Sequence, residues 1–266
     1  PGVVLQALAD GSKAHGWQFL AIGDFKTPSN FRLEGCQYMD LASQAETGFA
    51  FACACPTNHY ARKNVGYLEA IRAGANLIVE TDDDNTPSND FWRTRKRRVH
   101  VPTMQDNGWT NVYRYFSDLF IWPRGFPLEQ ARHQPPDMDK LPVVEADCPI
   151  QQGLVDGDSD VDAVYRLLIS LPVSFQPEVR VALGSGSWCT FNSQNTAWWY
   201  DAFPLLYLPA HCSFRVTDIW RGMVAQRIAW ANNWNVLFSS PDMIHDRNPH
   251  NRLTDFEQEV PFHILM

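Results

Sequence analysis

Cysteine is scarce in this sequence of 266 residues, and its six cysteines form no Cys-x-x-Cys pair. This spacing argues against structural zinc and against a disulfide-stapled miniprotein, and it leaves one or two disulfides open. Positive charge is also in deficit, because 22 lysines and arginines stand against 30 acidic residues, for a formal net charge of −8. Since nucleic-acid affinity depends on clustered positive charge, we expect no nucleic-acid partner.

Long apolar runs are absent as well. No segment approaches the roughly 18 residues of a membrane span, so we expect no span within this chain. The N-terminus lacks the basic and then apolar pattern of a signal peptide. The chain begins at Pro1 without a methionine, which suggests a trimmed piece of a longer protein. The expected location is the Golgi lumen if the source is a eukaryote and a membrane anchor has been removed, and the cytoplasm otherwise.

The first third of the chain alternates between helical and strand patterns, which predicts an α/β fold. A helix is expected over residues 3–14 and an apolar strand over 17–22, ending at Asp24. A second helix is expected over 62–73, followed by a short buried strand over 77–79. At this length, one domain over the whole chain is the expected organisation.

The remainder is harder to interpret. Residues 86–149 are rich in Pro, Asn, Asp and basic residues with no lasting period, and we expect long loops over the sheet. Helices are expected over 162–171 and 217–234, then a strand over 236–238 and a polar tail.

An acidic run, Glu80-Thr81-Asp82-Asp83-Asp84, follows the strand over 77–79 directly. In open α/β sheets, ligands bind beyond the carboxyl ends of the strands, where this run and Asp24 would converge. Carboxylates spaced in this way suit a divalent cation that binds a diphosphate. Taken alone, the run is equally compatible with a solvated acidic turn.

Four later residues are further candidates. Asp160 and Asp162 belong to an alternating acidic stretch that lacks the Gly and Glu of an EF-hand loop. We expect them to cap the next helix, with acceptor contact as the alternative. Asp218 opens a helix, where a carboxylate serves as a cap or as a general base. His245 follows a strand and is either structural or a metal ligand.

Several motifs together resemble the STELLO glycosyltransferase domain over nearly the whole chain. The motifs are Ala21–Pro28, Arg62–Leu68, the acidic run, Trp122–Gly125, Gln151–Gly153 with Asp160–Asp162, and Asp218–Arg227. The resemblance implies a GT-A (Rossmann-like) fold with a mixed, mainly parallel sheet flanked by helices. It also implies a nucleotide-sugar-binding half over residues 1–85, and an acceptor-side half over 86–266 that carries the later metal and base elements.

The resemblance further implies a UDP-sugar donor, Mn²⁺ or Mg²⁺ as cofactor, and a carbohydrate or glycoconjugate acceptor. The donor would be contacted by Asp24, Lys26, Arg62, Asn64, Glu80 and Asp82. The metal ligands would be Asp82, Asp83, Asp84 and His245, and the catalytic residues Asp218 as base with Asp160 and Asp162. Two positions depart from the family pattern, because Glu80 replaces an expected Asp and Asp84 replaces a basic residue of the plant pattern.

These features predict a metal-dependent, inverting glycosyltransferase of the hexosyltransferase kind (EC 2.4). The first alternative is a catalytically inactive GT-A scaffold or interaction domain of a glycan-synthesis complex. The second is a nucleotidyltransferase, because that chemistry also uses paired carboxylates and a metal ion.

Overall fold

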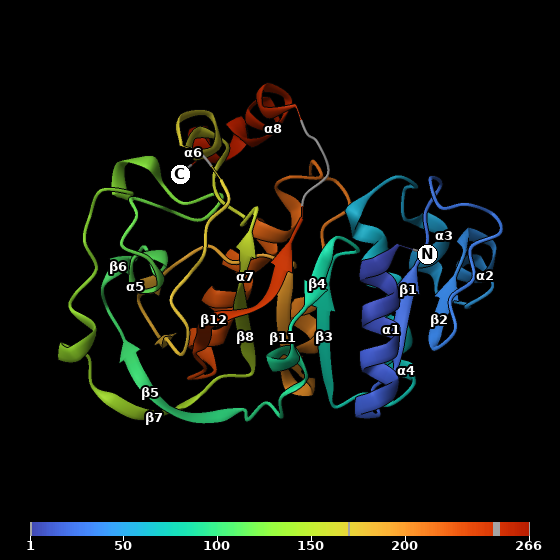
Figure 1. Ribbon diagram of the computed structural model, residues 1–266, viewed down its shortest axis with the longest axis horizontal. Helices are drawn as coiled ribbons and strands as arrows, with labels where there is room; N and C mark the ends of the chain where they lie inside the picture. The colour runs from blue at the N-terminus through green and yellow to red at the C-terminus, as the bar shows by residue number, and fades with distance from the viewer. Residues whose placement is uncertain (1, 170, 247–250, 266) are drawn as a thin grey trace.

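The computed structural model of the chain describes residues 2–169, 171–246 and 251–265. The centre of the molecule is a large mixed β-sheet flanked by helices (Figure 1). In spatial order its strands are β3 (Leu77–Thr81), β11 (Asn195–Trp199), β8 (Ile150–Gly157), β12 (Val236–His245), β9 (Arg180–Leu183), β5 (Arg98–Met104) and β7 (Val143–Asp147). A further strand, β4 (Asn85–Pro87), pairs with the end of β12.

Antiparallel pairs outnumber parallel pairs in this sheet. β8 is parallel to β12 and β9 is parallel to β5. β11 is antiparallel to both β3 and β8, and β12 is antiparallel to both β4 and β9. The predicted α/β fold with a mixed sheet flanked by helices is therefore confirmed, but the predicted predominance of parallel pairs is wrong. Antiparallel neighbours need no helical crossover, and most connections here are loops.

The N-terminal elements follow the prediction closely. Helix α1 (Val3–His15), strand β1 (Phe19–Ile22) and helix α4 (Lys63–Arg72) lie where helix, strand and helix were expected. β1 pairs in parallel with β2 (Cys36–Met39) in a separate two-stranded sheet. α4 lies close against β1 at Gly66. A Cβ added at this glycine would come within 2.9 Å of the Ile22 side chain. From this position α4 leads the chain into β3.

Residues 86–149 are more ordered than predicted, and the expectation of long loops is wrong for part of this segment. It contains β4, β5, β7 and the short strand β6 (Gly108–Trp109), which pairs with β10 (Ser187–Trp188). In β5, Arg98 and His100 are exposed whereas Val99 and Val101 are buried. This alternation is a strand signal, but it covers only a few residues and directly follows a largely basic run of residues, 93–97.

The shorter helices complete the fold. They are α2 (Leu41–Ala45), α3 (Ala50–Ala54), α5 (Tyr113–Phe116) and α6 (Ala163–Leu168), with 3-10 turns at Tyr60–Arg62, Asn89–Trp92, Leu128–Gln130, Met138–Lys140 and Tyr200–Leu206. α6 confirms the helix expected over 162–171, although residue 170 lies outside the described residues.

At the C-terminus, α7 (Thr217–Ala231) confirms the helix expected over 217–234. The predicted polar tail instead contains helix α8 (Arg252–Leu265), which packs against α6 at the top of Figure 1. Glu259 of α8 accepts a hydrogen bond from the Ala163 backbone N–H at 2.8 Å.

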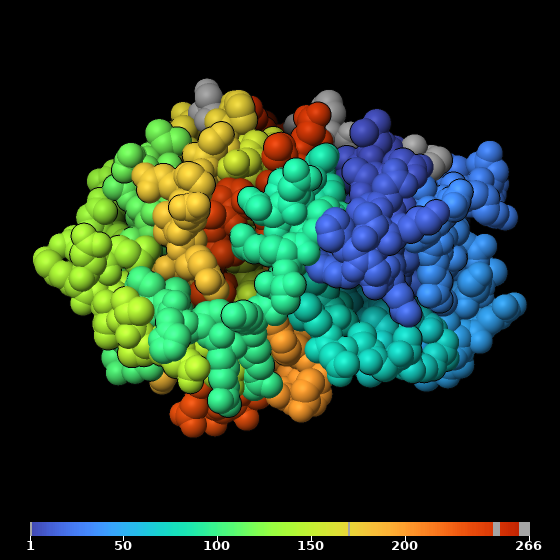
Figure 2. Space-filling view, turned by 60° about the horizontal axis from the view of Figure 1, so that its bottom comes forward, coloured from blue at the N-terminus to red at the C-terminus, as the bar shows by residue number. Residues whose placement is uncertain are grey.

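Apolar side chains fill both sides of the sheet. Trp198, Tyr165 and Phe238 are among the largest fully buried side chains. On the other side α1 packs beside β4, where the blue and teal atoms adjoin in Figure 2, and His15 stacks on Trp92 at 5.1 Å between ring centroids. Within the described part of the chain, no helix has both the length and the apolar character needed to cross a membrane.

Candidate functional site

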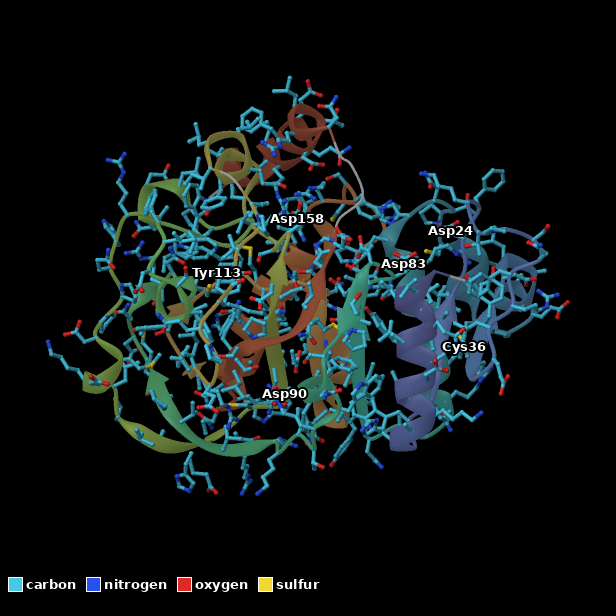
Figure 3. The ribbon with its side chains drawn as sticks, viewed as in Figure 1. Asp24, Cys36, Asp83, Asp90, Tyr113 and Asp158 are labelled. Atoms are coloured by element: carbon cyan, nitrogen blue, oxygen red, sulfur yellow. The ribbon has the colours of Figure 1, made fainter. Side chains whose placement is uncertain are left out.

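Three strands end at one edge of the large sheet, and a fourth begins there. β3 ends at Thr81 opposite Asn195, the first residue of β11, and β8 and β12 end together at Gly157 and His245. Figure 3 shows Asp83 and Asp158, which follow β3 and β8, at this edge, whereas Asp90 lies near the other end of the sheet. The acidic run therefore lies at the carboxyl ends of these strands, as predicted, whereas Asp24 follows β1, which belongs to the separate two-stranded sheet.

Asp82, the first residue after β3, is paired with a lysine. Lys63 Nζ donates to Asp82 Oδ1 at 2.5 Å, to Tyr60 OH at 2.8 Å and to the Ser193 carbonyl at 3.2 Å. Tyr60 OH also donates to Asp82 Oδ1 at 2.7 Å. Burial raises the pKa of Asp82, while the Lys63 charge acts against that shift. The Asp82 side chain is 27% exposed, so a ligand can approach it.

Asp84 and His245 form a second pair at the same edge. His245 Nε2 lies 3.0 Å from Asp84 Oδ2, and its Nδ1 lies 2.7 Å from the Asp158 carbonyl oxygen and 2.9 Å from Gln194 Nε2. Burial by itself would lower the pKa of His245, but the Asp84 contact raises it above the ordinary value. In the tautomer with the proton on Nδ1, this N–H donates to the Asp158 carbonyl and Nε2 keeps the lone pair that metal-binding histidines use.

The four predicted metal ligands are near one another but are not assembled into a cage. Among the described residues, no group of three or more His, Cys, Asp or Glu side chains is arranged to hold a metal ion. Asp84 and His245 are in contact, Asp82 is engaged by Lys63, and Asp83 is exposed on the turn. The ligand types fit Mn²⁺ or Mg²⁺, and completing such a site requires Asp82 to exchange Lys63 for the cation.

Asp218, the predicted base, lies in a buried charge network with Asp160. Arg124 donates to Asp218 at 2.9 and 3.1 Å and to Asp160 at 2.7 and 2.9 Å. Asn192 Nδ2 also donates to Asp160 at 2.6 Å. Burial by itself would raise the pKa of Asp160, but Arg124 holds it well below its ordinary value. Arg124 therefore brings together Asp160 and Asp218, two of the three predicted catalytic residues. The sequence analysis assigned no role to this arginine.

Asp162 lies apart from that pair and caps α6. Its Oδ1 accepts a hydrogen bond from the Val164 backbone N–H at 2.9 Å, which confirms the cap predicted for Asp162. The same prediction is wrong for Asp160, because its carboxylate binds Arg124 and Asn192 instead. Burial, reinforced by the charge of Glu259, raises the pKa of Asp162 to about 7.

Three of the predicted donor contacts are enclosed in the protein. Glu80 is 4% exposed and accepts hydrogen bonds from Trp198 Nε1 at 2.8 Å, from Arg221 Nη2 at 2.8 Å and from Tyr67. Arg62 is buried and donates to Gln44 and to backbone carbonyls. Asn64 is buried and bonds both backbone groups of Leu208. These side chains stabilise the fold around the edge, and we leave them out of the proposed donor site.

The two remaining donor candidates lie in the connection after β1. The Asp24 carboxylate accepts hydrogen bonds from the backbone N–H groups of Asn58 at 2.8 Å and His59 at 3.1 Å. It thereby fixes the segment that carries Tyr60. Lys26 is exposed.

The segment Asn192–Gln194, before β11, connects the two charge networks, and the sequence reasoning gave it no role. Ser193 Oγ donates to Tyr60 OH at 2.6 Å, and Ser193 N donates to Asp218 Oδ2 at 3.3 Å. Gln194 contacts His245, as described above. The sequence shows only an aromatic-rich stretch here, because the partners are far away along the chain.

Gly222 allows α7 to approach this segment. A Cβ at Gly222 would lie 2.5 Å from the Phe191 carbonyl oxygen, a backbone atom that cannot move alone. We expect Gly222→Ala to lower the free energy of unfolding by about 1–3 kcal/mol, as overpacking does. Thermal unfolding measures this, with Val224→Ala on the exposed side of α7 as the control. Equal midpoints for Gly222→Ala and the wild type would contradict the close approach.

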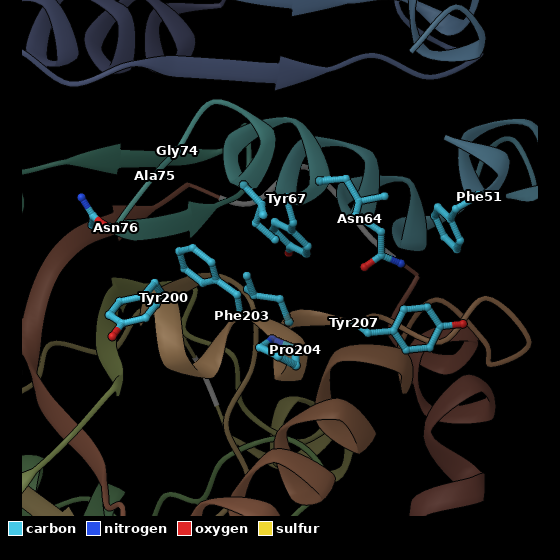
Figure 4. Close-up of a pocket in the computed structure, with 13 residues that line it drawn as sticks. Phe51, Asn64, Tyr67, Gly74, Ala75, Asn76, Tyr200, Phe203, Pro204 and Tyr207 are labelled. Atoms are coloured by element: carbon cyan, nitrogen blue, oxygen red, sulfur yellow. The ribbon is translucent and has the colours of Figure 1, made fainter. Parts of the chain in front are cut away.

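An apolar surface cavity lies between α4 and the turn 200–206 (Figure 4). Its volume is about 750 Å³. Its lining includes Phe51, Tyr67, Tyr200, Phe203, Pro204 and Tyr207. No charged side chain is among the described residues that line it. A nucleoside diphosphate needs positive charge, so this cavity is not a suitable donor site.

Comparison with known proteins gives two relatives. They are the Arabidopsis thaliana proteins named "Probable glycosyltransferase STELLO1" and "Probable glycosyltransferase STELLO2", each 32% identical to this chain over 237 and 239 residues respectively. Each alignment covers 82% of this chain and 31% of the relative, so the chain matches about a third of each relative's length. No protein-family model matches the chain.

Proposed function

Since the chain belongs to the STELLO-like glycosyltransferase family, we propose that it transfers a sugar from a UDP-sugar to a hydroxyl group of a carbohydrate or glycoconjugate. The observation that carries the proposal is the turn Asp82–Asp84 at the carboxyl end of β3, beside His245 and Lys63. Sugar transfer releases a nucleoside diphosphate, and the protein must hold and neutralise that anion. Carboxylates, a histidine and a lysine at one edge provide the groups for this task.

Mn²⁺ or Mg²⁺ is the proposed cofactor, held by Asp82, Asp84 and His245, with Asp83 on the exposed side of the turn. When bound, the cation would neutralise the charge that develops on the leaving diphosphate. Lys63 has to release Asp82 in this arrangement. The Lys63 side chain is about one-fifth exposed, and its ammonium group is then free to donate to a phosphate oxygen of the donor, together with Lys26.

Asp218 is the proposed general base, and inversion at the anomeric carbon follows from a direct attack by the acceptor hydroxyl. The hydroxyl loses its proton to an Asp218 oxygen while its own oxygen forms the new bond to the sugar, and UDP leaves. Arg124 binds Asp218 and Asp160 at once, and Asp160 can keep the arginine neutralised when Asp218 turns to the acceptor. The Asp218 side chain is 4% exposed, so its use requires that turn.

One observation favours a second function, an inactive scaffold. The Lys63–Asp82 pair neutralises the carboxylate on which donor binding depends. In a scaffold this pair would persist, and the chain would bind neither cation nor UDP while remaining folded.

Product analysis tests the proposed reaction class. We expect the protein, incubated with Mn²⁺ and UDP-glucose, UDP-galactose or UDP-N-acetylglucosamine, to release UDP from at least one donor, because water replaces the acceptor slowly in such sites. EDTA should abolish the release. Release of pyrophosphate would instead indicate a nucleotidyltransferase, and a folded protein that releases neither product would support the scaffold.

A further inference from the structure

The second surface cavity lies in the acceptor-side half of the chain and has a volume of about 520 Å³, within the usual range of small-molecule sites. It is formed by β6, the residues on either side of it, and the segment 130–135. The lining residues are Asn107, Gly108, Trp109, Thr110, Asn111, Gln130, His133, Gln134 and Pro135. Figure 1 places β6 on the opposite side of the molecule from α1.

The lining is polar but has no carboxylate, lysine or arginine among its described residues. Amide and hydroxyl groups from Asn107, Thr110, Gln130 and Gln134 both donate and accept hydrogen bonds. An anionic ligand would find no lysine or arginine among these lining residues, although Arg114 donates to Gln134 Oε1 from outside the lining at 3.4 Å. An apolar ligand would leave the remaining donors and acceptors of these side chains unpaired. The chemistry therefore matches a neutral ligand with many hydroxyl groups.

Trp109 gives this polar cavity a rigid apolar surface. Its ring is stacked on Trp188 at 6.0 Å between centroids, and it makes a T-shaped contact with Phe126 at 5.6 Å between centroids. These contacts fix the indole, which remains partly exposed in the cavity wall. A pyranose ring combines an apolar C–H face with a rim of hydroxyl groups, so it can cover such a ring while bonding to the amides.

One buried polar atom in the lining still lacks a partner. Asn111 is 1% exposed, and its Nδ2 donates to the Ile121 carbonyl at 2.8 Å. Its Oδ1 is buried and has no hydrogen-bond partner among the residues that the structure describes. An unpaired buried acceptor is costly, and this one belongs to a residue that lines the cavity. By contrast, Asn107 Nδ2 already donates to Thr110 Oγ1 at 2.9 Å.

We propose that this cavity binds a neutral saccharide unit of the acceptor, with Trp109 beneath the sugar ring and Asn111, Gln134 and His133 around its hydroxyl groups. This proposal rests on the proposed glycosyltransferase function. A structural link supports it, because Tyr113, two residues after Asn111, donates from its OH to the Asp160 carbonyl at 3.4 Å. The chain that leaves the cavity at Asn111 therefore passes beside Asp160, whose carboxylate shares Arg124 with the proposed base.

Saturation-transfer NMR with cellobiose, maltose, lactose and mannobiose tests the proposal, with digalacturonate as the charged counterpart. We expect at least one neutral disaccharide to receive saturation from the wild type, and digalacturonate to receive none. Gln134 is exposed, so Gln134→Ala should fold normally and weaken binding by about 2–10-fold, the value of one hydrogen bond. Trp109→Ala should weaken it further, and Gln37→Ala, an exposed residue on β2, should have no effect.

The proposal is overturned if no neutral disaccharide binds, if digalacturonate binds equally well, or if Gln134→Ala and Trp109→Ala bind like the wild type. UDP binding in the presence of Mn²⁺, measured on the same samples, separates this outcome from a failure of the proposed function. UDP binding without saccharide binding removes the cavity proposal alone. Saccharide binding at Trp109 without UDP binding removes the transferase proposal and leaves a carbohydrate-binding cavity.

Discussion

Asp218→Asn is expected to lower kcat by about 10²–10⁴-fold while the affinity for UDP stays within twofold of the wild type, the loss that removal of a general base causes. Asparagine keeps the size of aspartate but cannot take the acceptor's proton. Steady-state kinetics with the productive UDP-sugar measures kcat, and calorimetry measures UDP binding. Asp10→Asn, an exposed aspartate on α1, is the matched control.

The stability of Asp218→Asn must be measured alongside its activity. Arg124 is buried, and Asp160 and Asp218 together neutralise its charge. Asp160 still pairs with Arg124 in this variant, so we expect it to fold. Asp160→Asn removes the other partner and distinguishes the two carboxylates: it should lower kcat less than Asp218→Asn. A larger loss in Asp160→Asn than in Asp218→Asn would transfer the role of base to Asp160.

Asp82→Asn is expected to weaken Mn²⁺-dependent UDP binding by about 100-fold or more. Even residues that only support metal ligands contribute about 10–100-fold to metal affinity, and Asp82 is proposed to bind the metal directly. The variant should remain folded, because Asn still accepts hydrogen bonds from Lys63 and Tyr60, and the side chain is 27% exposed.

Calorimetric titration of UDP with Mn²⁺ measures this effect. Asp90→Asn is the control, since Asp90 is exposed and lies far from the edge (Figure 3). Unchanged UDP affinity in Asp82→Asn would remove Asp82 from the donor site.

The fold of the N-terminal third and the location of the edge could be predicted from local patterns. Apolar periodicity indicated α1, α4 and α7, and the apolar residues before Asp82 indicated β3. These signals depend on neighbours within a few residues. Strand pairing does not, and the antiparallel course of β11 between β3 and β8 left no local trace in the sequence.

The same distinction applies to the candidate site. The sequence indicated Asp82, Asp218 and His245 by type and position, but their partners come from distant segments. Lys63 and Ser193 are separated by 130 positions, and Arg124 and Asp218 by 94. Lys63 belongs to the motif Arg62–Leu68, but the family resemblance indicates its neighbours Arg62 and Asn64 as donor contacts.

Burial explains why Arg62 and Asn64 do not fit the role of donor contacts. Arg62 and Asn64 are at most 5% exposed, and their polar groups are used by Gln44, Cys55 and Leu208. A sequence pattern gives the residue type, but it does not reveal which side chains the fold encloses.

We propose that the residues at the carboxyl end of β3 bind a UDP-sugar through a divalent cation. Titration of UDP into the wild-type protein, once with Mn²⁺ and once with EDTA, tests it most directly. We predict saturable one-to-one binding with Mn²⁺ and at least about tenfold weaker binding with EDTA, because the cation links the carboxylates to the diphosphate. Equal binding in both titrations, or no binding of UDP to the folded protein in either, would contradict the claim.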